Sequence, residues 1–96
     1  MCKELFRLGR TVATPNALAA LEAAGVSSAS LLARHHQGDW GDLCAEDAAA
    51  NGLALEEGAR IFSSYQVPAA DGGSFKVWVI TEADRSATTV LLPEDY

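Results

Sequence analysis

The sequence predicts a single α+β domain over residues 1–96, with an N-terminal extended arm, three short helices and then a three-stranded antiparallel meander packed against the helices. Two observations predict this class. Apolar residues recur at helical spacing up to about residue 58, and from Ala59 onward the period changes from 3.6 to 2. Helices that are segregated from strands along a chain cover one face of the sheet. A chain of 96 residues can bury a modest core without disulfides or metal.

The first helix has the clearest start. Residues 5–13 read as an extended arm or a short strand, which Gly9 weakens. Thr14 is then suited to cap a helix whose first residue is Pro15, because proline is tolerated where a backbone N–H has no partner inside the helix. Apolar residues follow at helical spacing, and Gly25 is a good C-terminal stop. The prediction is a helix over residues 15–24.

Similar start and stop signals predict two further helices. Ser27 or Ser28 caps a helix over residues 29–37, on which Leu31, Leu32 and His35 lie close to one face. After a loop that contains Trp40, a third helix covers about residues 45–57 and ends at Gly58.

Alternation defines the strands. Residues 59–67, 75–81 and 87–92 alternate with period 2, and they are separated by a turn rich in Pro, Asp and Gly and by a second, polar turn. The strand over residues 75–81 is apolar on both faces, which predicts that it is central in the sheet.

The net charge of −6 comes from one stretch of the chain. Between residues 39 and 57 there are six carboxylates and no Lys or Arg, whereas the remaining seven acids balance seven bases. Six carboxylates without a countercharge repel one another, and a patch of one sign attracts a cationic partner and repels nucleic acid. We therefore expect contact with a protein of basic surface, and no direct contact with nucleic acid. The expected contact residues are Asp39, Trp40, Asp42, Glu46, Asp47, Glu56 and Glu57.

Other features point to a cytoplasmic protein without a membrane partner or a cofactor. There is no run of about 18 apolar residues and no apolar segment typical of a signal peptide. Cys2 and Cys44 have no CxxC spacing and no His pair at zinc-ligand intervals, so reduced thiols and no bound metal are expected.

An enzyme is the rival class. A metal-independent ribonuclease needs a base, an acid and a cation for the phosphate, and His36, Arg60 and Arg85 offer these groups. Histidine is suited to proton transfer because its pKa lies near neutral pH. Adjacent residues on a helix diverge by about 100°, so we expect one of the two neighbouring histidines to pack on the core and the other to face water.

Two segments carry a resemblance to a known family. Gly38-Asp39-Trp40-Gly41-Asp42-Leu43, together with the stretch from Val77 to Pro93, resembles small bacterial proteins of plasmids and integrative elements, called plasmid-related proteins. Some of them carry the name type I restriction endonuclease subunit M. That name does not suit this sequence, which has neither the Gly-rich cofactor loop nor the Asn-Pro-Pro-aromatic motif of a methyltransferase. The family has no established activity, so the resemblance transfers no catalytic residue.

These expectations combine into one hypothesis and two alternatives. The hypothesis is a small acidic protein-binding protein of a mobile genetic element, with an anti-defence role: it inhibits a host defence nuclease because its carboxylates imitate phosphates. One alternative is a ribonuclease similar in layout to barnase, EndoU and RelE, which uses His36, Arg60 and Arg85. The other is an accessory protein of unknown function. Whether the protein is an enzyme stays open at this point.

Overall fold

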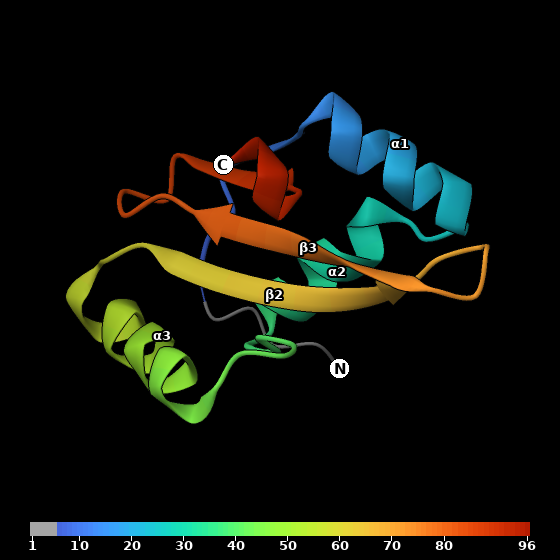
Figure 1. The fold of residues 1–96 in the computed structure, drawn as a ribbon. Coiled ribbons are helices and arrows are strands. Elements are labelled where there is room, and N and C mark those ends of the chain that lie inside the picture. The colour runs from blue at the N-terminus through green and yellow to red at the C-terminus, as the bar shows by residue number, and fades with distance from the viewer. Residues whose placement is uncertain (1–5) are drawn as a thin grey trace.

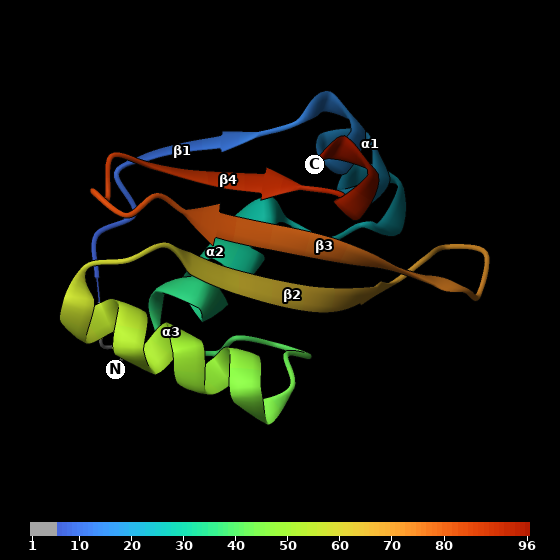
Figure 2. The ribbon, with the colours of Figure 1, turned by 60° about the vertical axis from the view of Figure 1, so that its left-hand side comes forward.

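A computed structural model describes residues 6–96, so Cys2 and the start of the predicted arm at residue 5 lie outside the described residues. Three helices and four strands form one α+β unit (Figures 1 and 2). The elements are β1 (Arg10–Ala13), α1 (Pro15–Ala24), α2 (Ser28–His36), α3 (Ala45–Glu57), β2 (Ile61–Pro68), β3 (Ser74–Thr81), β4 (Ala87–Leu91) and a 3₁₀ turn, η1 (Pro93–Asp95).

The helices form where the local signals predict them. The side chain of Thr14 accepts a hydrogen bond from the backbone N–H of Ala17, and Gly25 ends α1 in the left-handed conformation. Ser27 caps α2 in the same way as Thr14 caps α1. Within the described residues, no single helix is long and apolar enough to cross a membrane; α1 and α2 reach that length only together, across a bend of 105°.

The sheet corrects one part of the prediction. Its strand order is β1-β4-β3-β2, with β3 central and antiparallel to both of its neighbours, as expected. The three-stranded antiparallel meander is nevertheless incomplete, because the arm supplies a fourth strand, β1, which pairs in parallel with β4. The sheet is therefore mixed.

Gly9 explains how the arm reaches β4. Its φ is +65°, and a Cβ at this position would collide with the backbone of Arg85 and Ser86. The glycine therefore allows a close approach of two backbones. The N–H of Arg10 then donates to the carbonyl of Ser86 at 3.0 Å, and β1 is in register from its first residue.

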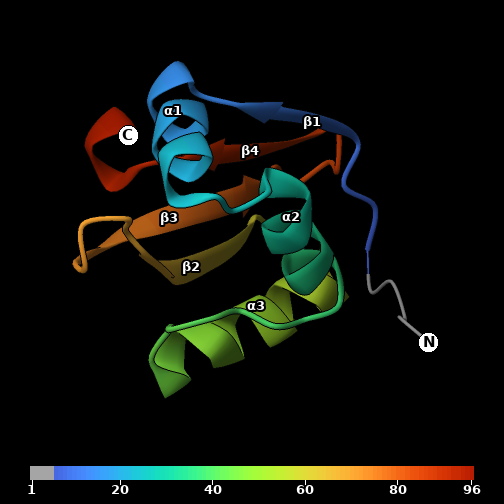
Figure 3. The ribbon, with the colours of Figure 1, turned by 90° about the vertical axis from the view of Figure 1, so that its right-hand side faces the viewer.

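The core lies between the sheet and two helices. Figure 3 shows α1 and α2 on the same side of the sheet. Their buried residues meet alternate residues of β2, β3 and β4, which is the periodicity expected of a sheet with one covered face. The buried cluster consists of Ala17, Leu21, Leu31, Tyr65, Val67, Val77, Val79 and Val90.

Helix α3 lies along the outer edge of β2 (Figures 1 and 2). The Asn51 side chain donates to the carbonyl of Phe62 at 2.5 Å and accepts from the N–H of Phe62 at 3.1 Å. The loop before α3 pairs with Ser64, which donates to the Trp40 carbonyl at 3.2 Å and accepts from the Asp42 N–H at 2.7 Å. An edge strand with unsatisfied backbone groups attracts other strands, and these contacts cover part of that edge.

Candidate functional site

The outward face of α3 is the candidate binding site. Asn51 and Ala54 are buried against β2, which fixes the rotation of the helix about its axis. Leu53 is consequently turned to solvent and is 57% exposed. Glu46 and Glu57 lie seven residues before and four residues after Leu53, so helical periodicity places both on the same side as Leu53.

Carboxylates occur at both ends of α3 and in the loop before it. All of them are exposed, and no Lys, Arg or His occurs between residues 37 and 59. In the part of the chain that the structure describes, none of them forms an ion pair within 4.0 Å. We call this exposed acidic surface of α3 and the preceding loop the acidic face; its members are Asp42, Glu46, Asp47, Leu53, Glu56 and Glu57. Asp47 lies four residues before the inward Asn51 and is exposed because it is in the first turn of the helix.

The positions of the acids along α3 have opposite effects on helix stability. Glu46 and Asp47 lie in the first turn, where the positive end of the helix dipole favours them. Glu56 and Glu57 are the last two residues of the helix, where the dipole disfavours a negative charge. Local stability therefore does not explain the second pair.

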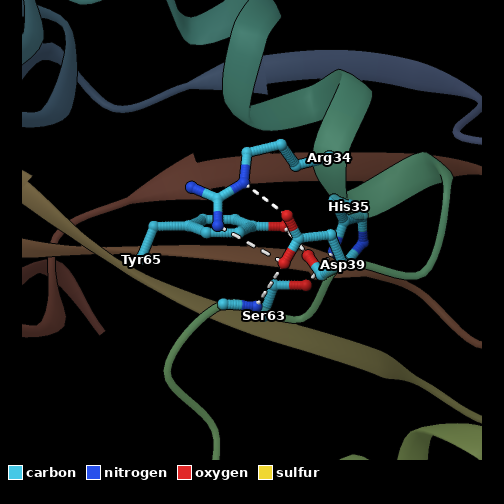
Figure 4. Close-up of polar contacts among 6 residues, drawn as sticks. Arg34, His35, Asp39, Ser63 and Tyr65 are labelled. Atoms are coloured by element: carbon cyan, nitrogen blue, oxygen red, sulfur yellow. Dashed lines mark hydrogen bonds and ion pairs between the residues drawn. The ribbon is translucent and has the colours of Figure 1, made fainter.

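Asp39 differs from the other five carboxylates because it has a cationic partner, Arg34 (Figure 4). Arg34 contacts it through two nitrogens, Nε to Oδ2 at 2.7 Å and Nη2 to Oδ1 at 3.3 Å. The hydrogen bond from Arg34 is the main cause that lowers the pKa of Asp39. The expectation that all six carboxylates lack a countercharge is therefore wrong for Asp39, because its partner lies five residues upstream, outside the acidic segment.

The Asp39 contacts fix the loop between α2 and α3. Its Oδ1 also accepts from the N–H of Gly41 at 3.1 Å, and its backbone carbonyl accepts from the Tyr65 hydroxyl at 2.6 Å. The Arg34 guanidinium lies 4.5 Å from the centroid of the Tyr65 ring (Figure 4). This cluster positions the chain that leads into the acidic face.

Trp40 follows Asp39 and is half-buried. Its ring centroid lies 5.8 Å from that of His35 and 6.2 Å from that of Phe6. The ring therefore packs inward and anchors the loop. Trp40 lies five residues before the start of α3.

A second polar cluster is fully buried and is centred on His35, which is 0% exposed. Its Nδ1 lies 2.5 Å from the Ser63 hydroxyl, and its Nε2 lies 2.9 Å from the Thr81 hydroxyl. Thr81 in turn contacts Thr88 at 2.7 Å, and Thr88 donates to the carbonyl of Leu8 at 2.7 Å.

The hydrogen bond from Thr88 to Leu8 determines which group donates in each of the other hydrogen bonds of this cluster. A carbonyl only accepts, so the Thr88 proton points to Leu8, and Thr88 accepts from Thr81. Thr81 then accepts from His35 Nε2–H, which leaves Nδ1 as the acceptor for the Ser63 hydroxyl. Burial lowers the pKa of His35 to about 4, which keeps the ring neutral, as this arrangement requires. The histidine that packs on the core is therefore His35, and its role is to join α2 to three strands.

The ribonuclease residues are not assembled into one site. Arg85 donates to the carbonyls of Ala54, Ala59, Glu82 and Ala83, which ties its guanidinium to the backbone. His36 and Arg85 lie on the Phe6 ring, at 5.8 Å and 5.7 Å from its centroid. Arg60 instead lines a cavity on the face of the sheet opposite α2.

That cavity is the site that sequence reasoning missed. Arg60 lines it together with four large apolar side chains: Phe62, Trp78, Ile80 and Tyr96. The signal was present, since Phe62, Trp78 and Ile80 all have the alternation phase opposite to the core residues of their strands. For metals, no group of three or more potential ligand residues occurs among residues 6–96.

No protein-family model matches this chain, no curated protein is significantly similar to it, and no solved structure matches its fold at a significant level.

Proposed function

We propose that the protein binds a partner protein with a basic surface and that the acidic face of α3 is the contact. The observation that carries this proposal is the orientation of α3. The helix is attached to the edge of β2 through Asn51, so its carboxylates and Leu53 point to solvent and have no described cationic partner.

The composition of the acidic face suits an interface. Leu53 supplies an apolar centre, and burying one leucine side chain stabilises a complex by up to about 1.5–3 kcal/mol. Glu46 and Glu57 share its side of the helix, and charges of one sign beside an apolar centre accelerate association with a basic partner. Exposed charges of this kind contribute little to the free energy of unfolding. Binding to a partner therefore explains Glu56 and Glu57 better than stability does.

In a more specific form of the proposal, the carboxylates of the acidic face imitate the phosphates of a nucleic acid. Glu46 and Glu57 are 11 positions apart, which corresponds to about 16 Å along a helix axis. The four carboxylates over this length form two pairs at the two ends of the helix, and carboxylates of one sign can take the place of phosphates on a basic surface. The partner would then be a nucleic-acid-binding enzyme, and we propose a host defence nuclease that this protein of a mobile genetic element inhibits.

Comparison of three forms of the protein as affinity baits tests the proposal. The forms are the wild type, the E46Q/E56Q/E57Q variant, and a control, E22Q/E82Q/E94Q, which removes the same charge from exposed residues outside α3. Quantitative mass spectrometry identifies basic proteins captured from a bacterial extract at low and high salt.

We expect a basic nuclease to be retained by the wild type and the control at low salt, released by salt, and lost with the α3 variant. The purified nuclease should be inhibited by the same two forms. Equal capture by all three baits would contradict the proposal, since net charge alone or another surface would then explain the binding.

A further inference from the structure

The face of the sheet opposite α1 and α2 carries an aromatic cavity. Phe62 on β2, together with Trp78 and Ile80 on β3, has the phase that points away from the core residues Ser63, Val77 and Val79. The rings of Phe62 and Trp78 meet edge to face, with centroids 5.0 Å apart. Ile80 is buried, and Phe62 and Trp78 are half-buried, so this apolar patch is partly open to solvent. Apolar patches that remain open to solvent mark binding sites.

A clamp at the end of the chain supplies the outer wall of the cavity. Asp95 accepts from the hydroxyl of Thr14 at 2.7 Å and from the Asn16 amide at 2.8 Å, so η1 is joined to the start of α1. This contact brings the next residue, Tyr96, over β3, where its ring lies 5.8 Å from that of Trp78. The wall is therefore held by hydrogen bonds from a separate element.

The space between these rings is not filled by protein. It has a volume of about 280 Å³ and is lined by Arg60, Phe62, Trp78, Ile80 and Tyr96. Pockets that take drug-sized ligands begin at about 300 Å³, so this cavity suits a molecule of roughly one ring system.

Arg60 adds a single positive charge to an otherwise apolar lining. Its guanidinium lies 5.6 Å from the centroid of the Tyr96 ring and donates to the Tyr96 hydroxyl at 3.1 Å. A guanidinium has five N–H donors, and among the described residues no carboxylate lies within 4.0 Å of this one. The contact with Tyr96 orients the guanidinium and leaves other donors for an anion.

We propose that this cavity binds a small aromatic carboxylate, with the ring against Phe62 and Trp78 and the carboxylate on Arg60. Each half of the ligand corresponds to an observed feature. Aromatic rings favour edge-to-face or offset contact with a further ring, and a guanidinium pairs with a carboxylate through two parallel N–H bonds. The site lies on β2, β3 and the end of the chain, and it is independent of the acidic face of α3.

NMR titration of the wild-type protein tests this inference, with the indole N–H signals of Trp78 and Trp40 as reporter and internal control. The probes are phenylacetate, its uncharged amide phenylacetamide, and acetate, each added up to about 10 mM, which exceeds a millimolar Kd. Trp40 packs on His35 and Phe6 and does not line the cavity, so its signal should not move.

We expect phenylacetate to shift the Trp78 signal with saturation, and phenylacetamide to bind roughly tenfold more weakly because it lacks the charge-assisted hydrogen bond. In the Arg60→Gln variant, phenylacetate should bind as weakly as the amide. Lys76→Gln removes an exposed cation from the same strand face outside the cavity, and it should leave the affinity unchanged.

Three results would overturn the proposal: no shift of the Trp78 signal, equal affinity for the acid and the amide in the wild type, or equal loss of affinity in the Arg60 and Lys76 variants. A thermal melt of each variant confirms that it is folded. Arg60 is exposed and makes no described contact with the buried core cluster, so both substitutions are expected to preserve the fold.

Discussion

Helices α2 and α3 use their polar residues in opposite ways. Helix α2 directs His35 into the protein, where hydroxyls from β2 and β3 contact its two ring nitrogens and a hydroxyl from β4 extends the chain of hydrogen bonds. Helix α3 directs a single polar side chain inward, Asn51, and turns its four carboxylates to solvent. Polar residues are frequent on both helices, and the rotation of each helix about its axis decides whether they hold the fold together or remain available for a partner.

The buried His35 ring needs a hydrogen-bond partner for each of its nitrogens. A buried polar atom without a hydrogen bond costs about 1–3 kcal/mol, so an inward-facing histidine is tolerated only if both ring nitrogens are paired. In the described part of the chain, no buried side-chain nitrogen or oxygen lacks a partner. The outward carboxylates are under no such condition, because water solvates them. Four experiments test or sharpen this difference.

The largest effect is expected for His35→Ala. The substitution removes a fully buried ring and leaves the hydroxyls of Ser63 and Thr81 without their partner, so we expect a loss of about 3–5 kcal/mol in the free energy of unfolding. Urea denaturation at neutral pH measures it. The control is His36→Ala, the neighbouring and only partly buried histidine, which should lose less. Equal losses would show that the His35 cluster is not the joint between α2 and the sheet.

The pH dependence of stability is the next effect. The pKa of His35 falls from 6.5 in the unfolded chain to about 4 in the fold, so the unfolded state binds more protons between these values. Stability from this group is complete above about pH 6.5 and decreases as the pH falls, by about 2 kcal/mol between about pH 7 and pH 5.

Urea denaturation at several pH values checks this dependence. The range stays above the usual pKa of aspartate, so Asp39 and Asp95, whose pKa values are lowered by hydrogen bonds, contribute little to it. A wild-type stability that is flat from about pH 7 to pH 5 would contradict a neutral, buried His35.

Two neighbouring residues test the rotation of α3. Asn51→Ala deprives the N–H and the carbonyl of Phe62 of their partner and should cost about 2 kcal/mol of stability. Leu53→Ala, two positions later, removes an exposed side chain and should change stability by less than about 0.5 kcal/mol, while it weakens capture of the partner. The reverse pattern in thermal melts would mean that α3 presents its other side to the solvent.

Local signals were sufficient for much of the fold. The bounds of α1 were predicted as residues 15–24, because a cap, a proline and a stop glycine are encoded within a few residues. For α3, predicted over about residues 45–57, the acids of the first turn and the stop glycine Gly58 were the local signals. The central place of β3 followed from its two apolar faces. Strand β1 was not predicted as part of the sheet, since its partner β4 begins 77 residues later and Gly9 was interpreted only as a weakness.

The sites depend on contacts between distant segments, which explains what the sequence did not reveal. The position of His35 on the inner face of α2 was predictable, but its two hydroxyl partners come from β2 and β3, which are 28 and 46 residues away in the chain. Arg34 lies just outside the acidic segment, so a count over residues 39–57 did not include the partner of Asp39. The aromatic cavity requires Tyr96, which Asp95 brings into place through a contact with Thr14, 81 residues away.

The most direct test concerns the two acids at the end of α3. If the acidic face exists for binding, Glu56 and Glu57 contribute nothing to the fold, and the helix dipole makes them slightly unfavourable. Urea denaturation of the E56Q/E57Q variant at low and high salt measures this contribution. We predict an unchanged free energy of unfolding, or a gain of up to about 1 kcal/mol that salt removes. A loss of more than about 1 kcal/mol at low salt would show that these carboxylates stabilise the protein itself, and it would contradict their assignment to a partner.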